Sequence, residues 1–390
     1  MIIYNVMVFT EDLKFVPGMV VISHGKITEV CLGQSYVAAW GERKGEEVFD
    51  GKGNYLIPGM IDIHLHGCKG YDFCDATLEA VEQIAAFQAS IGVTTIAPAT
   101  MTLPVESLCE ALEQGAVFYK AKNSGRFLKC ADLAGINMEG PFISEAKKGA
   151  QKATNIRKPD TDLFRRLQKS ATGLIKYIGV APEMEGALEF IRNVREEVKV
   201  TLAHSEADYA TGKKAFEAGA SHVTHLYNGM NAFNHREPGI PGAVYDCNWT
   251  EAELICDGIH VHPAVIRATF HMLGKERIIL ISDSIRATGM EPGEYELGGQ
   301  QVLVKEDRAV ISGTETIAGS VVTLPQALRF VVKKAGISLE DALACVTKNP
   351  AISLGIYEEC GSVSVGKKAD LVLLDKELVV NGVMKNGSFL

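Results

Sequence analysis

The chain has 390 residues, 47% of them hydrophobic, and a formal net charge of −9. This length suits one large domain with a smaller companion, and the apolar fraction is typical of a globular protein rather than a disordered one. The acidic balance argues against a nucleic-acid-binding surface, and no run approaches the roughly 18 consecutive apolar residues that a membrane span needs.

The N-terminus and the cysteines both favour the cytoplasm. The apolar run in the first ten residues has no basic leader and is too short and too early for a signal peptide. The nine cysteines are scattered along the chain, and no Cys-x-x-Cys pair occurs among them. Without an export signal, such thiols are expected to stay reduced. We therefore predict a cytoplasmic protein whose cysteines are structural.

Short strand-like runs occur near both ends of the chain. They lie at residues 6–9, 15–22, 27–32, 371–374 and 378–383. Isolated hairpins are not stable in water, so the two groups of strands are expected to share a sheet. We predict a small discontinuous β-sandwich domain that is formed by residues 1–57 and 353–390.

Between these ends, apolar strands alternate with helical patterns. Eight such strands lie at residues 60–66, 93–100, 132–138, 176–181, 198–204, 221–227, 252–257 and 277–282. Apolar residues recur at helical spacing between most of them, as in 186–198. This alternation is typical of an α/β protein with a (β/α)₈ TIM barrel, which we place at residues 58–352. A β-hairpin insertion at about 294–312 follows the eighth strand and serves either as a surface ornament or as a lid.

Six polar side chains lie at the carboxyl ends of these strands. They are His64, His66, Glu139, His204, His225 and Asp283. The carboxyl ends of the strands in such a barrel surround one shared mouth, so residues distant in sequence can meet there. Nitrogen and oxygen ligands of this kind suit zinc or another divalent first-row metal. The sequence therefore predicts a metal centre at the mouth of the barrel.

A metal centre at this position favours hydrolysis of an amide. Bound Zn²⁺ lowers the pKa of water from about 15.7 to about 7 and can polarise the scissile carbonyl. The leaving nitrogen still needs a proton, and Asp283 is the natural acid and base that would deliver it. The alternative for Asp283 is a structural metal ligand.

Two loops beyond the strands carry candidates for substrate binding. His260 follows the seventh strand, so it also faces the mouth and is expected to contact the substrate or its carbonyl. Asn228 and Arg236 lie in a long loop after the sixth strand. The planar fork of an arginine suits a phosphate, although a loop arginine that meets only solvent is the alternative.

Several short motifs resemble those of a known enzyme superfamily. The segments 58–67, 348–351 and 366–371 resemble the amidohydrolase superfamily. Within it, further motifs are similar to those of the N-acetylglucosamine-6-phosphate deacetylase family. These motifs lie at 138–142, 147–150, 224–230, 236–239, 257–260 and 318–320. Their order and spacing extend the resemblance over nearly the whole chain.

The resemblance implies removal of the N-acetyl group of N-acetylglucosamine 6-phosphate, with release of acetate. It implies that Glu139, His204 and His225 hold the main metal, that Asp283 is the acid and base, and that His260 contacts the substrate near the acetyl group. The residues implied to bind the sugar phosphate or to line its pocket are Ala150, Gln151, Asn228, Gly229, Arg236, Ile317, Ala318 and Gly319. In this family the arginine can reach across from the partner of a homodimer, so we expect a homodimer.

Two features of this chain leave alternatives open. Some family members lack the His-x-His after the first strand and use one metal, whereas this chain has His64 and His66 and so holds one or two ions. Zn²⁺ is the expected ion, with Fe²⁺ and Mn²⁺ as alternatives. The family often has histidine after Lys-Lys-Gly-Ala, whereas this chain has Gln151, which can form hydrogen bonds but carries no charge.

Three other functions compete with this interpretation. The epimer N-acetylgalactosamine 6-phosphate is the closest alternative substrate, because one hydroxyl group need not show in these motifs. A cyclic-amide hydrolase would use a carboxylated lysine at the end of the fourth strand, whereas Lys176 lies at its start. A catalytically silent scaffold of the same fold should have lost ligands, and this chain keeps every candidate.

Overall fold

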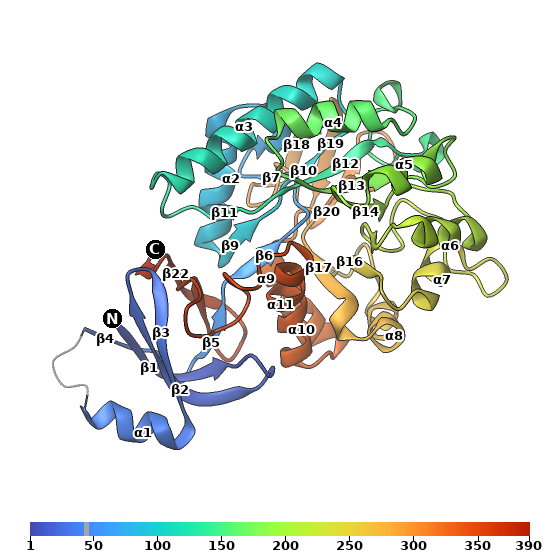
Figure 1. The fold of residues 1–390 in the computed structure, drawn as a ribbon. Coiled ribbons are helices and arrows are strands. Elements are labelled where there is room, and N and C mark those ends of the chain that lie inside the picture. The colour runs from blue at the N-terminus through green and yellow to red at the C-terminus, as the bar shows by residue number, and fades with distance from the viewer. Residues whose placement is uncertain (43–46) are drawn as a thin grey trace.

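Parallel strands with helices outside them form the larger part of the computed structural model, which describes residues 1–42 and 47–390 (Figure 1). The barrel strands, in order around the ring, are β6 (Met60–Asp62), β9 (Val93–Ile96) with β10 (Ala99–Thr100), β11 (Asp132–Leu133) with β12 (Ile136–Phe142), β13 (Ile175–Val180), β14 (Lys199–Leu202), β15 (His222–Val223), β16 (Glu251–Ile255) and β17 (Ile278–Ile281). Each paired neighbour is parallel. The predicted (β/α)₈ barrel is confirmed.

The ring consists of two hydrogen-bonded sheets, because its second and third strands are each interrupted. β6, β9 and β11 form one sheet, and β10 pairs with β12 in the other, which continues to β17. The ring closes where the backbone N–H of Asp283 donates to the carbonyl of His64 at 2.9 Å. His64 and Asp283, both predicted site residues, therefore lie where the first and last barrel strands meet.

Helices cover the outside of the barrel (Figure 1). They are α2 (Leu78–Ser90), α3 (Val105–Asn123), α4 (Thr161–Ser170), α5 (Ala187–Val194), α6 (Tyr209–Ala218), α7 (Gly239–Asp246), α8 (Pro263–Leu273), α9 (Leu324–Phe330) and α10 (Leu339–Val346). A further helix, α11 (Lys348–Ser353), lies at the amino ends of the strands, where Ser353 bonds to Lys199 and Glu251. In α5, Ala187, Phe190, Ile191 and Val194 are buried at the spacing of one helix face, so the helical pattern predicted for 186–198 is confirmed over residues 187–194. In the described part of the chain, no helix is both long and apolar enough to cross a membrane.

The barrel strands bury both of their faces. Ile178 packs in the large cluster that also holds helix residues such as Phe190, whereas its neighbour Tyr177 packs in a separate cluster with Ile255 and Ile279. Side chains one position apart on a strand point to opposite faces, so one face meets the helices and the other fills the barrel. A polar side chain within the ring must therefore find partners on neighbouring strands, whereas one at a strand end can face an open cavity.

Both ends of the chain contribute to one sheet beside the barrel. In spatial order its strands are β23 (Ser388–Phe389), β22 (Val380–Lys385), β21 (Leu371–Leu374), β5 (Tyr55–Pro58), β1 (Ile2–Phe9), β2 (Phe15–Ser23) and β3 (Lys26–Leu32), with β4 (Val48–Asp50) beside β1. β5 joins the two ends, because it pairs with β1 on one side and with β21 on the other. The shared sheet is confirmed, and α1 (Gly33–Glu42) is a helix that the sequence analysis did not anticipate.

An inserted sheet follows the last barrel strand. It consists of β18 (Gly293–Leu297), β19 (Gln300–Lys305) and β20 (Arg308–Ile311), which pair antiparallel. It therefore has one strand more than the predicted hairpin. Gly298 and Gly299 form its first turn with φ of 57° and 81°, a conformation that favours glycine. Smaller elements are β7 (Gly67–Cys68), β8 (Tyr71–Asp72), η1 (Phe73–Asp75), η2 (Glu145–Lys147), η3 (Ala153–Asn155), η4 (Lys275–Arg277) and the π-helical η5 (Val331–Ala335).

Candidate metal centre and active site

The predicted metal ligands lie at the carboxyl ends of barrel strands. His64 and His66 follow β6, Glu139 lies in β12, His204 follows β14, His225 follows β15 and Asp283 follows β17. The backbone φ is positive at His204 (44°), His225 (27°) and Asp283 (50°). Residues other than glycine rarely adopt this conformation, and such strain collects at functional sites. The turn after each of these three strands thus directs a polar side chain into the mouth.

Glu139, His204 and His225 form the most compact group. Oε1 of Glu139 lies 2.9 Å from Nε2 of His204 and 2.9 Å from Nε2 of His225, and the two nitrogens are 3.2 Å apart. Ligand atoms around a tetrahedral zinc ion, with bonds of about 2.0–2.1 Å, are separated by about 3.3 Å. All three side chains are buried. Their arrangement fits one divalent cation.

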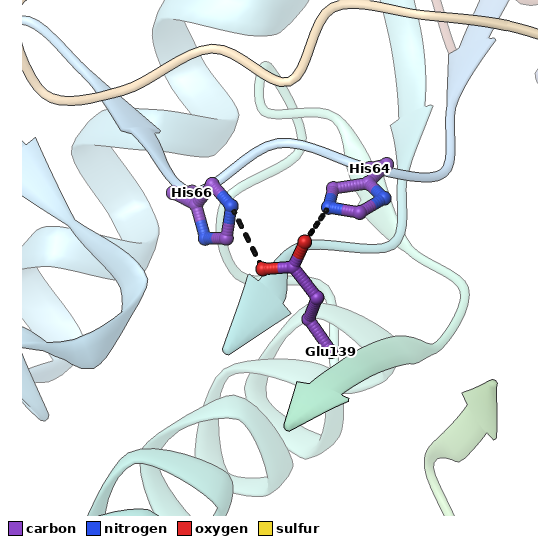
Figure 2. Close-up of side chains that lie close together, drawn as sticks. All are labelled: His64, His66 and Glu139. Atoms are coloured by element: carbon purple, nitrogen blue, oxygen red, sulfur yellow. Dashed lines mark ion pairs between the residues drawn. The ribbon is translucent and has the colours of Figure 1, made fainter. Parts of the chain in front are cut away.

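His64 and His66 form a second group on the same carboxylate. Figure 2 shows both imidazoles pointing at Glu139, with Nε2 of His64 3.6 Å from Oε1 and Nε2 of His66 3.5 Å from Oε2. Oδ1 of Asp283 lies 3.2 Å from Nε2 of His66 and 3.7 Å from Nε2 of His64. The two groups therefore share Glu139, and the second includes Asp283.

Nε2 of His64 provides an independent test of this fit. It is buried and, among the residues that the structure describes, has no hydrogen-bond partner. A buried polar atom without a partner costs about 1–3 kcal/mol, and native structures avoid this cost by pairing such atoms. A cation shared with Glu139 and Asp283 would complete the coordination of this nitrogen.

The other ring nitrogens of the main group are fixed by main-chain carbonyls. Nδ1 of His204 donates to the carbonyl of Lys147 at 2.8 Å, and Nδ1 of His225 donates to that of Asn228 at 3.0 Å. A proton on Nδ1 leaves the lone pair on Nε2, which is the atom that faces Glu139. The loops after β12 and β15 thus favour the tautomer that a metal ligand would need.

Glu253 plays the same part for His64, and the sequence analysis missed it. Its Oε2 accepts a hydrogen bond from Nδ1 of His64 at 2.8 Å, and the carboxylate is fully buried. The available signal was a charged residue inside the apolar strand β16. In a barrel strand that is buried on both faces, such a residue needs partners from neighbouring strands.

Both carboxylates of the centre are held in the ionised form. Burial alone would raise the pKa of Glu139, but the charge of a protonated His204 and the hydrogen bonds of His204 and His225 hold that pKa well below its usual range, and a cation in place of those protons would act in the same direction. Burial also opposes ionisation of Asp283, and the hydrogen bond from His66 together with the nearby imidazole charges lowers its pKa overall. Both groups are therefore anionic at neutral pH, as a metal ligand or a general base must be.

A cavity of about 340 Å³ opens beside these ligands. The predicted residues that line it are His66, Glu139, Ala150, Gln151, His204, His225, Asn228, Gly229, His260, Asp283, Ile317 and Gly319. The inserted sheet and the loop after it add Leu297, Glu315 and Thr316, which the sequence analysis did not identify. The insertion thus forms part of the wall of the cavity.

Three predicted residues do not line this cavity. His64 is fully buried behind it, and Ala318 is buried between two residues that do line it. Arg236 is exposed and lies in a separate depression with Asp208 and Asn231. Within a single chain, the arginine is therefore outside the site.

His260 is oriented from its own loop. Its Nδ1 donates to Oδ2 of Asp257 at 2.6 Å, and the backbone N–H groups of Ile259 and His260 each donate to Oδ1 at 2.8 Å. Asp257 lies two residues after Ile255, the last residue of β16. The ring that lines the cavity is therefore held by the same turn that ends the strand.

Comparison with known proteins places this site in a family. The model of the amidohydrolase family matches residues 55–390. The chain belongs to the amidohydrolase family. The match spans the whole barrel together with the C-terminal strands of the small sheet. The family and the ligand groups together imply a divalent metal in this amidohydrolase.

Two relatives of this amidohydrolase are deacetylases of amino-sugar phosphates. The N-acetylglucosamine-6-phosphate deacetylase of Bacillus subtilis is 37% identical over 97% of this chain and 94% of its own. The N-acetylgalactosamine-6-phosphate deacetylase of Escherichia coli O157:H7 is 34% identical over 85% of this chain and 86% of its own. The similarity thus extends over nearly the full length of both relatives.

Solved structures agree with the fold. A mutant N-acetyl-D-glucosamine-6-phosphate deacetylase from Mycobacterium smegmatis, in complex with N-acetyl-D-glucosamine 6-phosphate, is 30% identical, with a TM-score of 0.90 over 100% of this chain and 98% of that one. The N-acetylglucosamine-6-phosphate deacetylase from Thermotoga maritima is 30% identical, with a TM-score of 0.86 over 100% and 99% of the two chains. The amidohydrolase therefore shares its whole architecture with these enzymes.

Proposed function

We propose that this amidohydrolase is an N-acetylglucosamine-6-phosphate deacetylase. It hydrolyses the acetamide of N-acetylglucosamine 6-phosphate to glucosamine 6-phosphate and acetate. The observation that carries the proposal is the convergence of Glu139, His204, His225 and Asp283 on one cavity, in a chain 37% identical to a deacetylase of this specificity. The same residues argue against a silent scaffold, which should have lost ligands.

The metal ligands prepare the centre for hydrolysis. Glu139, His204 and His225 would hold a divalent cation, for which Zn²⁺ suits the nitrogen and oxygen donors, and His64 with His66 would hold a second. When bound, the cation would supply a Lewis acid for the acetyl carbonyl and would lower the pKa of the attacking water. The main-chain carbonyls behind His204 and His225 accept from Nδ1 of each ring, so Nε2 of each ring is the atom that would bind this ion.

Asp283 would move the proton that amide hydrolysis requires. Its carboxylate lines the cavity and is ionised, so it can accept a proton from the attacking water. The same group can then donate that proton to the leaving amine. Because it lies beside His66, it remains close to the ligands while it does so.

The remaining predicted residues would hold the sugar phosphate. His260 lies at the cavity with its ring fixed by Asp257 and would contact the acetyl group. The other residues proposed for the sugar and its phosphate are Ala150, Gln151, Asn228, Gly229, Ile317, Ala318 and Gly319. Arg236 would act from the partner in a homodimer, which its position outside the cavity of its own chain supports. The proposal includes the cytoplasmic location predicted from the sequence.

Steady-state kinetics on the two epimers test this function. We expect acetate release from N-acetylglucosamine 6-phosphate with kcat/KM at least tenfold above that for N-acetylgalactosamine 6-phosphate. The galacto epimer is the second candidate, because a relative with that specificity is 34% identical. A reversed ratio would establish the second candidate, and no acetate from either sugar would refute both.

A further inference from the structure

Glu253 lies within β16 and contacts four other groups in the barrel. Its Oε2 accepts hydrogen bonds from Nδ1 of His64 at 2.8 Å and from the backbone N–H of His225 at 3.2 Å. Its Oε1 accepts one from Nδ2 of Asn137 at 3.3 Å and lies 3.2 Å from Nε2 of His222. A carboxylate has about four acceptor positions, so these four donors saturate it.

The contact with His64 decides which nitrogen can bind metal. An ionised carboxylate only accepts hydrogen bonds, so Nδ1 of His64 carries a proton. The lone pair then lies on Nε2, which faces Glu139 and Asp283 and has no hydrogen-bond partner in the described chain. Glu253 therefore prepares the His64 side of the centre for a cation.

The contact with His225 acts on the other ligand group. The φ of His225 is 27°, an unfavourable backbone conformation that costs on the order of 1–3 kcal/mol and needs external support. The backbone N–H at this strained residue donates to Oε2 of Glu253, the same oxygen that accepts from His64. One oxygen thus connects a ligand of each group.

We propose that Glu253 is a positioning residue that joins the two ligand groups, and that the second group, formed by His64 and His66 with Glu139 and Asp283, holds its cation tightly only when Glu253 fixes His64. This inference rests on the metal-dependent function proposed above. Its test is metal binding rather than turnover, so it can fail while that function stands.

Glu251 offers a matched control on the same strand. It lies two positions before Glu253, so its side chain is on the same face of β16. Its Oε2 lies 3.2 Å from Nδ1 of His222 and accepts from Nζ of Lys199 at 2.8 Å. Among the described residues, Glu251 contacts His222, Lys199 and Ser353 but none of the predicted metal ligands. Loss of Glu251 therefore removes a half-buried charge beside His222, which Glu253 also contacts, without removing a contact to a predicted ligand.

Metal titration of the apo-proteins tests the proposal. Wild type, Glu253→Leu, Glu253→Gln and Glu251→Leu are titrated with Zn²⁺ against a chromophoric chelator. We expect wild type to bind two equivalents of Zn²⁺. In Glu253→Leu, the dissociation constant of the second Zn²⁺ should rise about 10–100-fold, which is the usual effect of removing the hydrogen-bond partner of a metal ligand. Glu253→Gln keeps one oxygen that can accept from Nδ1 of His64, so it should recover most of the affinity. Glu251→Leu should match wild type.

Three results would overturn the proposal. The first is that the dissociation constant of the second Zn²⁺ is the same in Glu253→Leu as in wild type. The second is that this constant rises equally in Glu251→Leu. The third is that wild type binds only one equivalent of Zn²⁺. Should Glu253→Leu fail to fold, ¹⁵N spectra of histidine-labelled, zinc-loaded wild type decide the point. The signal of His64, assigned with His64→Gln, must show a proton on Nδ1, and a proton on Nε2 would refute the proposal. Acetate release by wild type tests the deacetylase function separately.

Discussion

Gln151 donates a hydrogen bond from Nε2 to Oε2 of Glu139 at 2.5 Å. Its own Oε1 accepts from the backbone N–H of Thr102 at 2.6 Å, so the oxygen end of the amide is fixed and the amino end must face the carboxylate. The residue that differs from the histidine frequent in the family thus supports the one ligand that both metal groups share. Its proposed contact with substrate and this contact with Glu139 are compatible, because Gln151 also lines the cavity.

Replacing Gln151 should weaken metal binding. Gln151→Leu leaves Oε2 of Glu139 without its donor, and a hydrogen bond to a charged group is worth about 1.5–3 kcal/mol. We expect the dissociation constant for the first Zn²⁺ to rise at least tenfold in a chelator competition. Gln168→Leu is the control, since Gln168 also bonds main-chain groups, at Ile175, but lies away from the site. Equal affinities in both variants would contradict this role.

Asp283→Asn should abolish most of the activity. An amide cannot take a proton from water and return it, and general acid–base catalysis contributes about 10²–10⁴-fold. We expect kcat for acetate release to fall by this factor, while metal analysis still finds the ion held by Glu139, His204 and His225. A variant that keeps near-full activity would show that another group moves the proton.

Gly229→Ala should disturb His204. The φ of Gly229 is 63°, and an added Cβ would lie 2.9 Å from Nδ1 of His204, which must stay bonded to the carbonyl of Lys147. We expect weaker Zn²⁺ binding and lower kcat/KM. Gly173→Ala is the control for backbone strain without a steric clash. The φ of Gly173 is 86°, and an added Cβ would meet no atom within 4 Å. That control should lose about 1 kcal/mol of stability and no metal affinity.

Glu251 should contribute to stability in a defined pH range. Burial alone would raise its pKa, but the hydrogen bond with His222 and the charge of Lys199 lower it to about 2, from an ordinary value of 4.5. A lowered pKa stabilises the fold above pH 4.5, and this contribution is lost as the pH falls toward 2. Between pH 7 and pH 3, metal-free wild type should therefore lose about 2 kcal/mol more unfolding free energy than Glu251→Gln, measured by urea denaturation. Parallel pH profiles would exclude this contribution.

Metal removal should lower thermal stability as well as activity. A ligand at one hundred times its dissociation constant stabilises the folded state by about 2.7 kcal/mol. We expect a chelator to lower the unfolding midpoint in calorimetry and added Zn²⁺ to restore it. His204→Ala should show little of this shift, because it lacks a ligand of the main group. An identical shift in that variant would place the stabilising ion elsewhere.

The barrel and the convergence of polar side chains at its mouth could be predicted because the relevant signals are local. A strand such as 198–204 is apolar until its last residue, and the position of His204 at that end is readable without knowing its neighbours. The role of Glu253 could not be read in this way, because its donors come from residues on or beside β6, β12 and β15. The helix α1 was missed because it lies between strands of the small sheet, where the pattern of the flanking runs favours β structure.

The pairing of β5 with β21 also constrains how the molecule assembles. Residues 59–370, which include the entire barrel, separate these neighbours in the sequence, so the sheet that contains both has very high contact order. On the ribosome, the barrel strands emerge before β5 can meet its partner. The small sheet must therefore close late, and a defect that slows barrel formation should leave β1, β2 and β5 with an unpaired edge that favours aggregation.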